Sequence, residues 1–172
     1  EDAREGVAPG ERVPLQIAFD PAARSAEVLD GLGDTLCAVQ LGKWSEWVRL
    51  DFGPRGEGTV RFLLFSCDQA SEFGLTLAHS SIYPTRGFTF PENLSEELVQ
   101  RVGPFLASPT RLPGAHGDAV YIDDYRYQGL WIARAAKHLI ETRGMGLCYQ
   151  HYHIIDSASH QYLNQADPEG GG

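Results

Sequence analysis

The stretch Gly-Pro-Arg-Gly-Glu-Gly at residues 53–58 separates two runs of strand-like sequence. The run at 44–52 places Trp and Val among polar residues. The run at 60–67, Val-Arg-Phe-Leu-Leu-Phe-Ser-Cys, is almost continuously apolar. Gly and Pro clustered between two such runs are typical of a turn that joins two strands.

Three further runs predict strands, and no helical pattern interrupts them. They lie at residues 13–19, 35–41 and 75–83. About five short strands joined by turns favour an antiparallel sheet or a small sandwich. We therefore expect a β-rich region over residues 12–83, preceded by a polar, flexible lead-in at 1–11.

The pattern changes to a helical one after residue 84. Residues 92–103 have the spacing of a short amphipathic helix that ends at Gly103. Residues 106–121 are rich in Pro and Gly and predict a loop. A long helix should then open at Asp123 and run to about residue 143. Residues 145–155 have the apolar character of a further strand.

The predicted fold class is therefore α+β, with an antiparallel β-rich region followed by a helix–helix–strand piece at 84–172. A helix that leads by a short turn into a strand is half of a parallel crossover unit. Ligands in such folds gather at the carboxyl ends of strands. The sequence Ile-Ile-Asp-Ser-Ala-Ser-His at 154–160 places Asp156 at such an end.

Asp156 and His160 are the strongest candidates for chemistry. If a helix starts near Asp156, their spacing of four residues puts the carboxylate and the imidazole on one face, a turn apart. One oxygen and one nitrogen ligand can then converge on a divalent cation such as zinc. The competing interpretation is a helix N-cap at Asp156 and a surface histidine at 160.

Two other pairs of rings allow both a structural and a functional interpretation. His151 and His153 should face the same side of a strand, where they could bind a metal or form a half-buried polar pair at a sheet edge. Trp44 and Trp47 should point to opposite faces of their strand. They could pack the sheet or form the wall of a substrate pocket.

Composition excludes some classes of protein. Hydrophobic residues make up 42% and charged residues 22% of the 172 positions, which is ordinary for a globular protein. A net charge of −9 without a basic cluster argues against a nucleic-acid-binding surface. No apolar run is long enough to cross a membrane. We expect three buried free thiols, at Cys37, Cys67 and Cys148.

Three stretches resemble the alkaline phosphatase superfamily, in its branch of type I phosphodiesterases and nucleotide pyrophosphatases. Gly-Lys-Trp-Ser-Glu-Trp-Val at 42–48 is similar to a motif in a β-rich insertion of some members. The segment at 90–105 is similar to the one that follows this insertion. Tyr-His-Ile-Ile-Asp-Ser-Ala-Ser-His at 152–160 resembles the strand and Asp-x-x-x-His metal motif of the family.

The resemblance implies a two-metal phosphoesterase with an alkaline-phosphatase-like α/β core, here incomplete. Two divalent ions, zinc by family analogy, clamp the reacting phosphodiester or nucleotide-like substrate. Asp156 and His160 match the Asp and first His of the second metal site. The β-rich region corresponds to an insertion that covers the active site and helps to select the substrate.

The family positions that this sequence lacks are as informative as those that it matches. No position here matches the family nucleophile, its upstream metal-binding Asp, the Asp-His pair or the final His, and no Ser lies in a nucleophile elbow. The chain therefore resembles a middle fragment of a larger enzyme, which we expect to be inactive by itself and which need not bind a metal alone. A cut strand at 146–155 could promote dimerisation. The alternative is a non-catalytic β-rich binding or interaction module.

Overall fold

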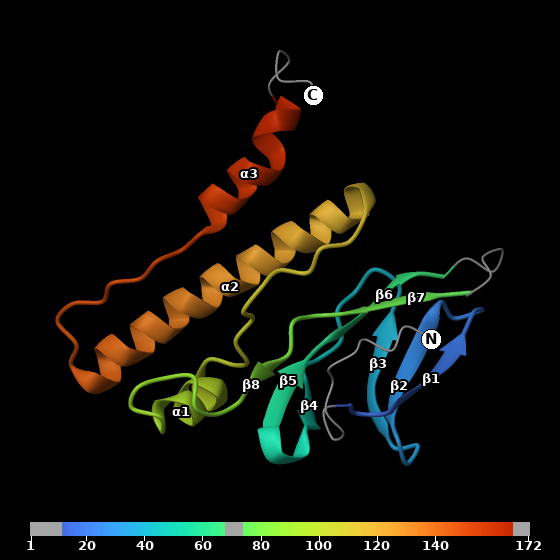
Figure 1. Ribbon diagram of the computed structural model, residues 1–172, viewed down its shortest axis with the longest axis horizontal. Helices are drawn as coiled ribbons and strands as arrows, with labels where there is room; N and C mark the ends of the chain where they lie inside the picture. The colour runs from blue at the N-terminus through green and yellow to red at the C-terminus, as the bar shows by residue number, and fades with distance from the viewer. Residues whose placement is uncertain (1–11, 68–73, 167–172) are drawn as a thin grey trace.

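The computed structural model describes residues 12–67 and 74–166, so the predicted lead-in at 1–11 lies outside the described residues. The chain has mixed α+β structure, with the strands first and the helices after them (Figure 1). The strands are β1 Leu15–Asp20, β2 Ser25–Asp30, β3 Thr35–Gln40, β4 Val48–Asp51, β5 Glu57–Val60, β6 Phe62–Ser66, β7 Thr76–His79 and β8 Tyr83–Pro84. The helices are α1 Leu94–Arg101, α2 Gly114–Arg143 and α3 Ile154–Ala166, with a 3₁₀ turn at Gly53–Arg55.

The strands form three small antiparallel sheets, ordered β1-β2-β3, β4-β5-β8 and β6-β7. The antiparallel β-rich prediction is thus confirmed, but the expected five strands were too few. Strand β2 was missed because only Ala26 and Val28 of its six residues are buried, which is a weak apolar signal. The connection between β4 and β5 is shorter than the turn predicted at 53–58, because β5, a second missed strand, already begins at Glu57.

Strand β6 is buried on both faces, which explains its unbroken apolar sequence. Phe62 and Leu64 face the core shared by β2, β3, β4 and β5. Leu63, between them, faces the other way and packs with Ala78 and with Val120 of α2. The strand therefore joins the sheet core to the helical part of the chain.

Helix α1 confirms the short amphipathic helix, and Leu98 buries its inner face against Trp131 of α2. The predicted loop at 106–121 is wrong from residue 114 onward, because α2 begins there and Asp123 lies within it. A Cβ at Gly117 would lie 2.0 Å from the Leu112 carbonyl oxygen. This glycine lets the preceding chain approach the helix and does not interrupt it.

The strand predicted at 145–155 is also wrong. Residues 144–153 have no strand partner among the described residues, and α3 already begins at Ile154. The segment runs back along α2 (Figure 1), where the Tyr152 hydroxyl donates a 2.5 Å hydrogen bond to the Tyr125 carbonyl. An apolar, strand-like sequence forms a strand only beside another strand edge, and the described chain brings none to this place.

The expectation of three buried thiols is also corrected. Cys148 is exposed on the segment that follows α2, whereas Cys37 and Cys67 are half-buried. All three are free, as expected. Among the helices within 12–67 and 74–166, none is both long and apolar enough to cross a bilayer.

Candidate functional site

Asp156 and His160 lie together on the exposed side of α3. The Asp156 Oδ1 atom is 3.4 Å from His160 Nε2, and their side chains are 64% and 81% exposed. Asp156 is in the first turn of α3, where a negative charge interacts favourably with the helix dipole. It is not the N-cap, since the helix begins two residues earlier.

The separation of this pair suits a shared metal ion. Two ligand atoms at about 2.1 Å from a tetrahedral zinc ion are about 3.4 Å apart, so the distance between these two atoms is compatible with one shared ion. Two ligands make only half of a typical tetrahedral site. Within the described residues, no group of three or more His, Cys, Asp or Glu side chains is arranged to hold a metal ion.

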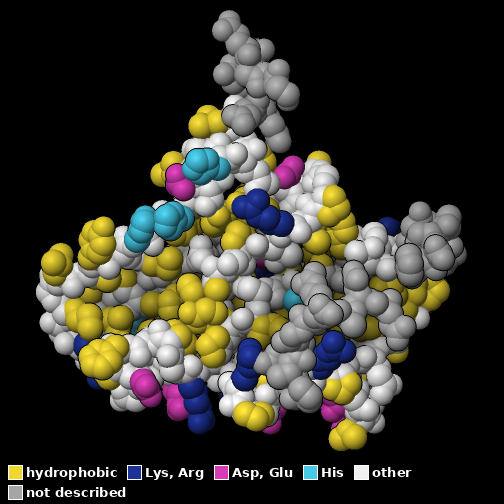
Figure 2. Space-filling view, viewed as in Figure 1, with side chains coloured by type: hydrophobic (Ala, Val, Ile, Leu, Met, Phe, Trp, Pro, Cys, Tyr) yellow, Lys and Arg dark blue, Asp and Glu magenta, His cyan; other side chains and the backbone are white. Residues whose placement is uncertain are grey.

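Two further histidines lie beside the pair. His153 Nδ1 is 3.8 Å from the other carboxylate oxygen of Asp156, and the rings of His151 and His153 have centroids 4.0 Å apart. The two histidines are thus neighbours, although the strand that was expected to align them does not form. Figure 2 shows histidine side chains beside an acidic one near α3.

Helix α3 is held on α2 by polar contacts. The Tyr162 hydroxyl donates a 3.0 Å hydrogen bond to Asp118 Oδ1, and Gln161 Nε2 is 3.5 Å from the same atom. Burial and the Asp118 carboxylate raise the pKa of Tyr162. These contacts leave the Asp156 and His160 side chains on the solvent side.

No protein-family model, no curated protein and no solved structure matches this chain. The function proposed below therefore rests on the geometry of the chain's own residues.

A second polar cluster, which sequence reasoning missed, surrounds Arg61. Its guanidinium carbon lies 4.4 Å from the ring centroid of Trp44, 5.2 Å from that of Trp47 and 4.9 Å from that of Tyr127. Its Nη2 donates a 2.5 Å hydrogen bond to Asp124 Oδ1. The prediction that Trp44 and Trp47 point to opposite faces is wrong, because both rings turn toward this cation.

Asp124 is fully buried and holds two segments together. Its Oδ2 accepts a 2.7 Å hydrogen bond from the Thr110 amide, while Oδ1 accepts from Arg61. Burial raises the pKa of Asp124, and the hydrogen bonds from Thr110 and Arg61 act in the opposite direction. Since Arg61 is between β5 and β6 and Asp124 is on α2, this pair attaches the sheets to the long helix.

A third cluster joins α1 to the end of α2. One carboxylate oxygen of Glu97 is 2.7 Å from His138 Nε2, and the other pairs with Arg143. The hydrogen bond with His138, and then that with Arg143, lowers the pKa of Glu97. These contacts fix the two helices side by side, and nothing in their geometry requires a ligand.

One sequence signal could have identified the Arg61 cluster. Arg61 is a single charge inside the apolar run at 60–67, and a buried Arg needs a partner. The partner is 63 positions away on another element, so no local pattern reveals that it is Asp124.

Proposed function

We propose that this chain is part of a two-metal phosphodiesterase or nucleotide pyrophosphatase-like hydrolase of the alkaline phosphatase superfamily. In this proposal, Asp156 and His160 supply two ligands of one metal site. The nucleophile and the other metal ligands are supplied by residues outside these 172. The chain by itself then does not catalyse the reaction.

The observation that carries the proposal is the 3.4 Å separation of Asp156 Oδ1 and His160 Nε2. The pair combines a hard oxygen with an imidazole nitrogen, which suits zinc. Both side chains are exposed, so further ligands and a phosphodiester can reach them from solvent. A metal ion at this position would stabilise developing negative charge on phosphate oxygens.

In the same proposal, the β-rich region covers the mouth of the active site and helps to select the substrate. The accessory sheets are joined firmly to α2 by Arg61 and Asp124, so their position relative to the helices is fixed. Removing residues 34–83 from the intact enzyme should change the ratios of kcat/KM among phosphodiesters more than it changes metal affinity. Unchanged ratios would count against this role.

The competing function is a non-catalytic β-rich interaction module in which Asp156 only stabilises the start of α3. Its position in the first helical turn is the observation in favour of this alternative. The two proposals differ in one measurable property, namely whether the Asp156–His160 pair binds a metal ion.

Calorimetric titration of the chain with zinc tests the first proposal. We expect weak binding of one ion to the wild-type chain and none to Asp156→Asn/His160→Gln, which keeps the side-chain sizes. The control Asp34→Ala/His116→Ala removes the same two residue types from exposed positions elsewhere and should bind like the wild type. Equal binding by the wild type and the Asp156/His160 variant would favour the interaction module.

A further inference from the structure

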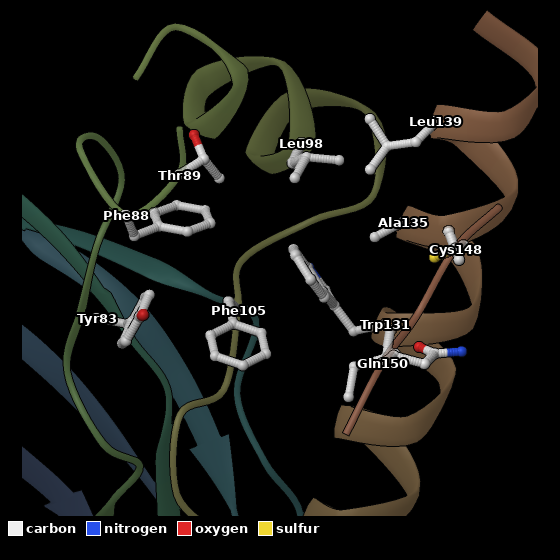
Figure 3. A pocket seen from close by; sticks show the side chains of 12 residues that line it. Tyr83, Phe88, Thr89, Leu98, Phe105, Trp131, Ala135, Leu139, Cys148 and Gln150 are labelled. Carbon is white, nitrogen blue, oxygen red and sulfur yellow. The ribbon is translucent and has the colours of Figure 1, made fainter. Parts of the chain in front are cut away.

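An apolar pocket of about 330 Å³ lies between β8, α1 and α2, away from the residues assigned above (Figure 3). Its walls come from five parts of the chain: β8, the loop before α1, α1 with the loop that follows it, α2, and the segment after α2. Ligand pockets in proteins usually begin at about this size. A dry apolar cavity of about 150 Å³ already holds benzene, so this one has room for a molecule of one or two rings.

Aromatic side chains form the rigid part of the wall. Phe105 contacts Trp131 with ring centroids 4.7 Å apart and contacts Tyr83 at 5.0 Å, in tilted and edge-to-face arrangements. The Trp131 Nε1 atom donates a 2.7 Å hydrogen bond to the Gly103 carbonyl, which fixes the indole. Figure 3 shows these rings around a common space. The wall is therefore formed before any ligand arrives, and this limits the entropic cost of binding.

The lining also indicates the charge of the ligand. None of the described residues that line the pocket is Asp, Glu, Lys, Arg or His. The polar groups among them are the Gln150 amide, the Thr89 and Tyr83 hydroxyls and the Cys148 thiol. A charged molecule would lose its hydration here without gaining an opposite charge. A neutral molecule with flat apolar faces loses little and can stack on the rings.

We propose that this pocket is a binding site for a small neutral aromatic compound. The site uses neither Asp156 nor His160, so it does not depend on the function proposed above. Small residues on α2 provide the space, since Ala135 and Ala136 face the pocket where larger side chains would fill it.

The test uses two dyes that share one aromatic framework and differ in charge. N-phenyl-1-naphthylamine is neutral, and 1-anilinonaphthalene-8-sulfonate carries a sulfonate. We expect the neutral dye to bind with one site per chain, with increased emission and energy transfer from tryptophan. The sulfonate should bind about tenfold more weakly or worse, because no cation lines the site.

Matched substitutions on α2 locate the bound dye. Ala136→Leu fills the pocket and should weaken binding of the neutral dye by about tenfold. Ala133→Leu, on the exposed side of the same helix, should leave it unchanged. Cys148→Trp narrows the pocket from an exposed position and should also weaken binding, which covers the case in which Ala136→Leu unfolds the chain. Equal affinity for both dyes, or binding unaffected by both Ala136→Leu and Cys148→Trp, would overturn the proposal.

Discussion

The Arg61 guanidinium donates a hydrogen bond to the fully buried Asp124 carboxylate over 2.5 Å, and three aromatic rings surround the cation. Both charged groups are shielded from water, so each charge is compensated mainly by the other. Removing one partner of such a pair leaves an uncompensated buried charge, whereas replacing both with apolar residues can be nearly neutral.

Asp124→Ala should therefore lower the free energy of unfolding by about 3–5 kcal/mol. The double variant Arg61→Met/Asp124→Leu should recover most of this loss. As a control, Arg49→Ala breaks an exposed pair with Glu57 and should cost less than about 1 kcal/mol. Urea denaturation measures all three, and a double variant as unstable as Asp124→Ala would contradict the argument.

Tyr127 contributes to this cluster in two separable ways. Its hydroxyl donates a 2.7 Å hydrogen bond to the Pro104 carbonyl, and its ring faces Arg61. Tyr127→Phe should cost about 1 kcal/mol through the lost hydrogen bond. Tyr127→Leu should cost about 1–2 kcal/mol more, because the cation–π contact is also lost. Tyr149→Phe, at a residue that is 90% exposed, should change nothing in the same denaturation experiment.

The Glu97 cluster predicts a pH dependence of stability. The pKa of Glu97 in the folded chain lies below its ordinary value of 4.5, owing to His138 and then Arg143. The unfolded chain therefore binds the proton more tightly, and the stabilisation from Glu97 is present above the unfolded pKa and is lost as pH falls through the folded one. The difference in Tm between wild type and Glu97→Gln should shrink below about pH 4.5. A difference that stays constant from pH 7 to pH 3 would contradict this assignment.

Gly129 makes room for Tyr152. A Cβ at this position of α2 would lie 2.6 Å from the Tyr152 hydroxyl oxygen. Alanine stabilises a helix interior by about 1 kcal/mol relative to glycine, but here it should displace Tyr152 from the Tyr125 carbonyl. Gly129→Ala should therefore stabilise the chain only in a Tyr152→Ala background, as measured by chemical denaturation. The same gain in both backgrounds would show that the contact is unimportant.

The strand-rich first half could be predicted because its signals are local. The apolar run at 60–67 contains β6, and the turn predicted at 53–58 contains the 3₁₀ turn Gly53–Arg55. The start of α2 was missed because glycine has two uses. It is common in loops, which is how it was interpreted here, and it also lets another part of the backbone pack closely against a helix. At Gly117 the second use applies, and it depends on Leu112 being placed against the helix.

The region at 145–155 shows a structure that local sequence predicts wrongly. Its apolar sequence predicts a strand, but a strand also needs an edge to pair with, and the segment itself cannot supply one. The Asp156–His160 spacing was more informative, since a separation of four residues needs only a local helix. The α3 helix forms from Ile154, and the two side chains meet as the spacing predicts.

The 63 positions between Arg61 and Asp124 also have a kinetic consequence. Most pairings among β1 to β8 join near neighbours in sequence and close short loops, so they can form early during folding. The contact of Arg61 with α2 closes a long loop and should form after the rate-limiting step. Asp124 variants should then refold at nearly the wild-type rate and unfold faster, so that their chevron plots differ mainly in the unfolding arm.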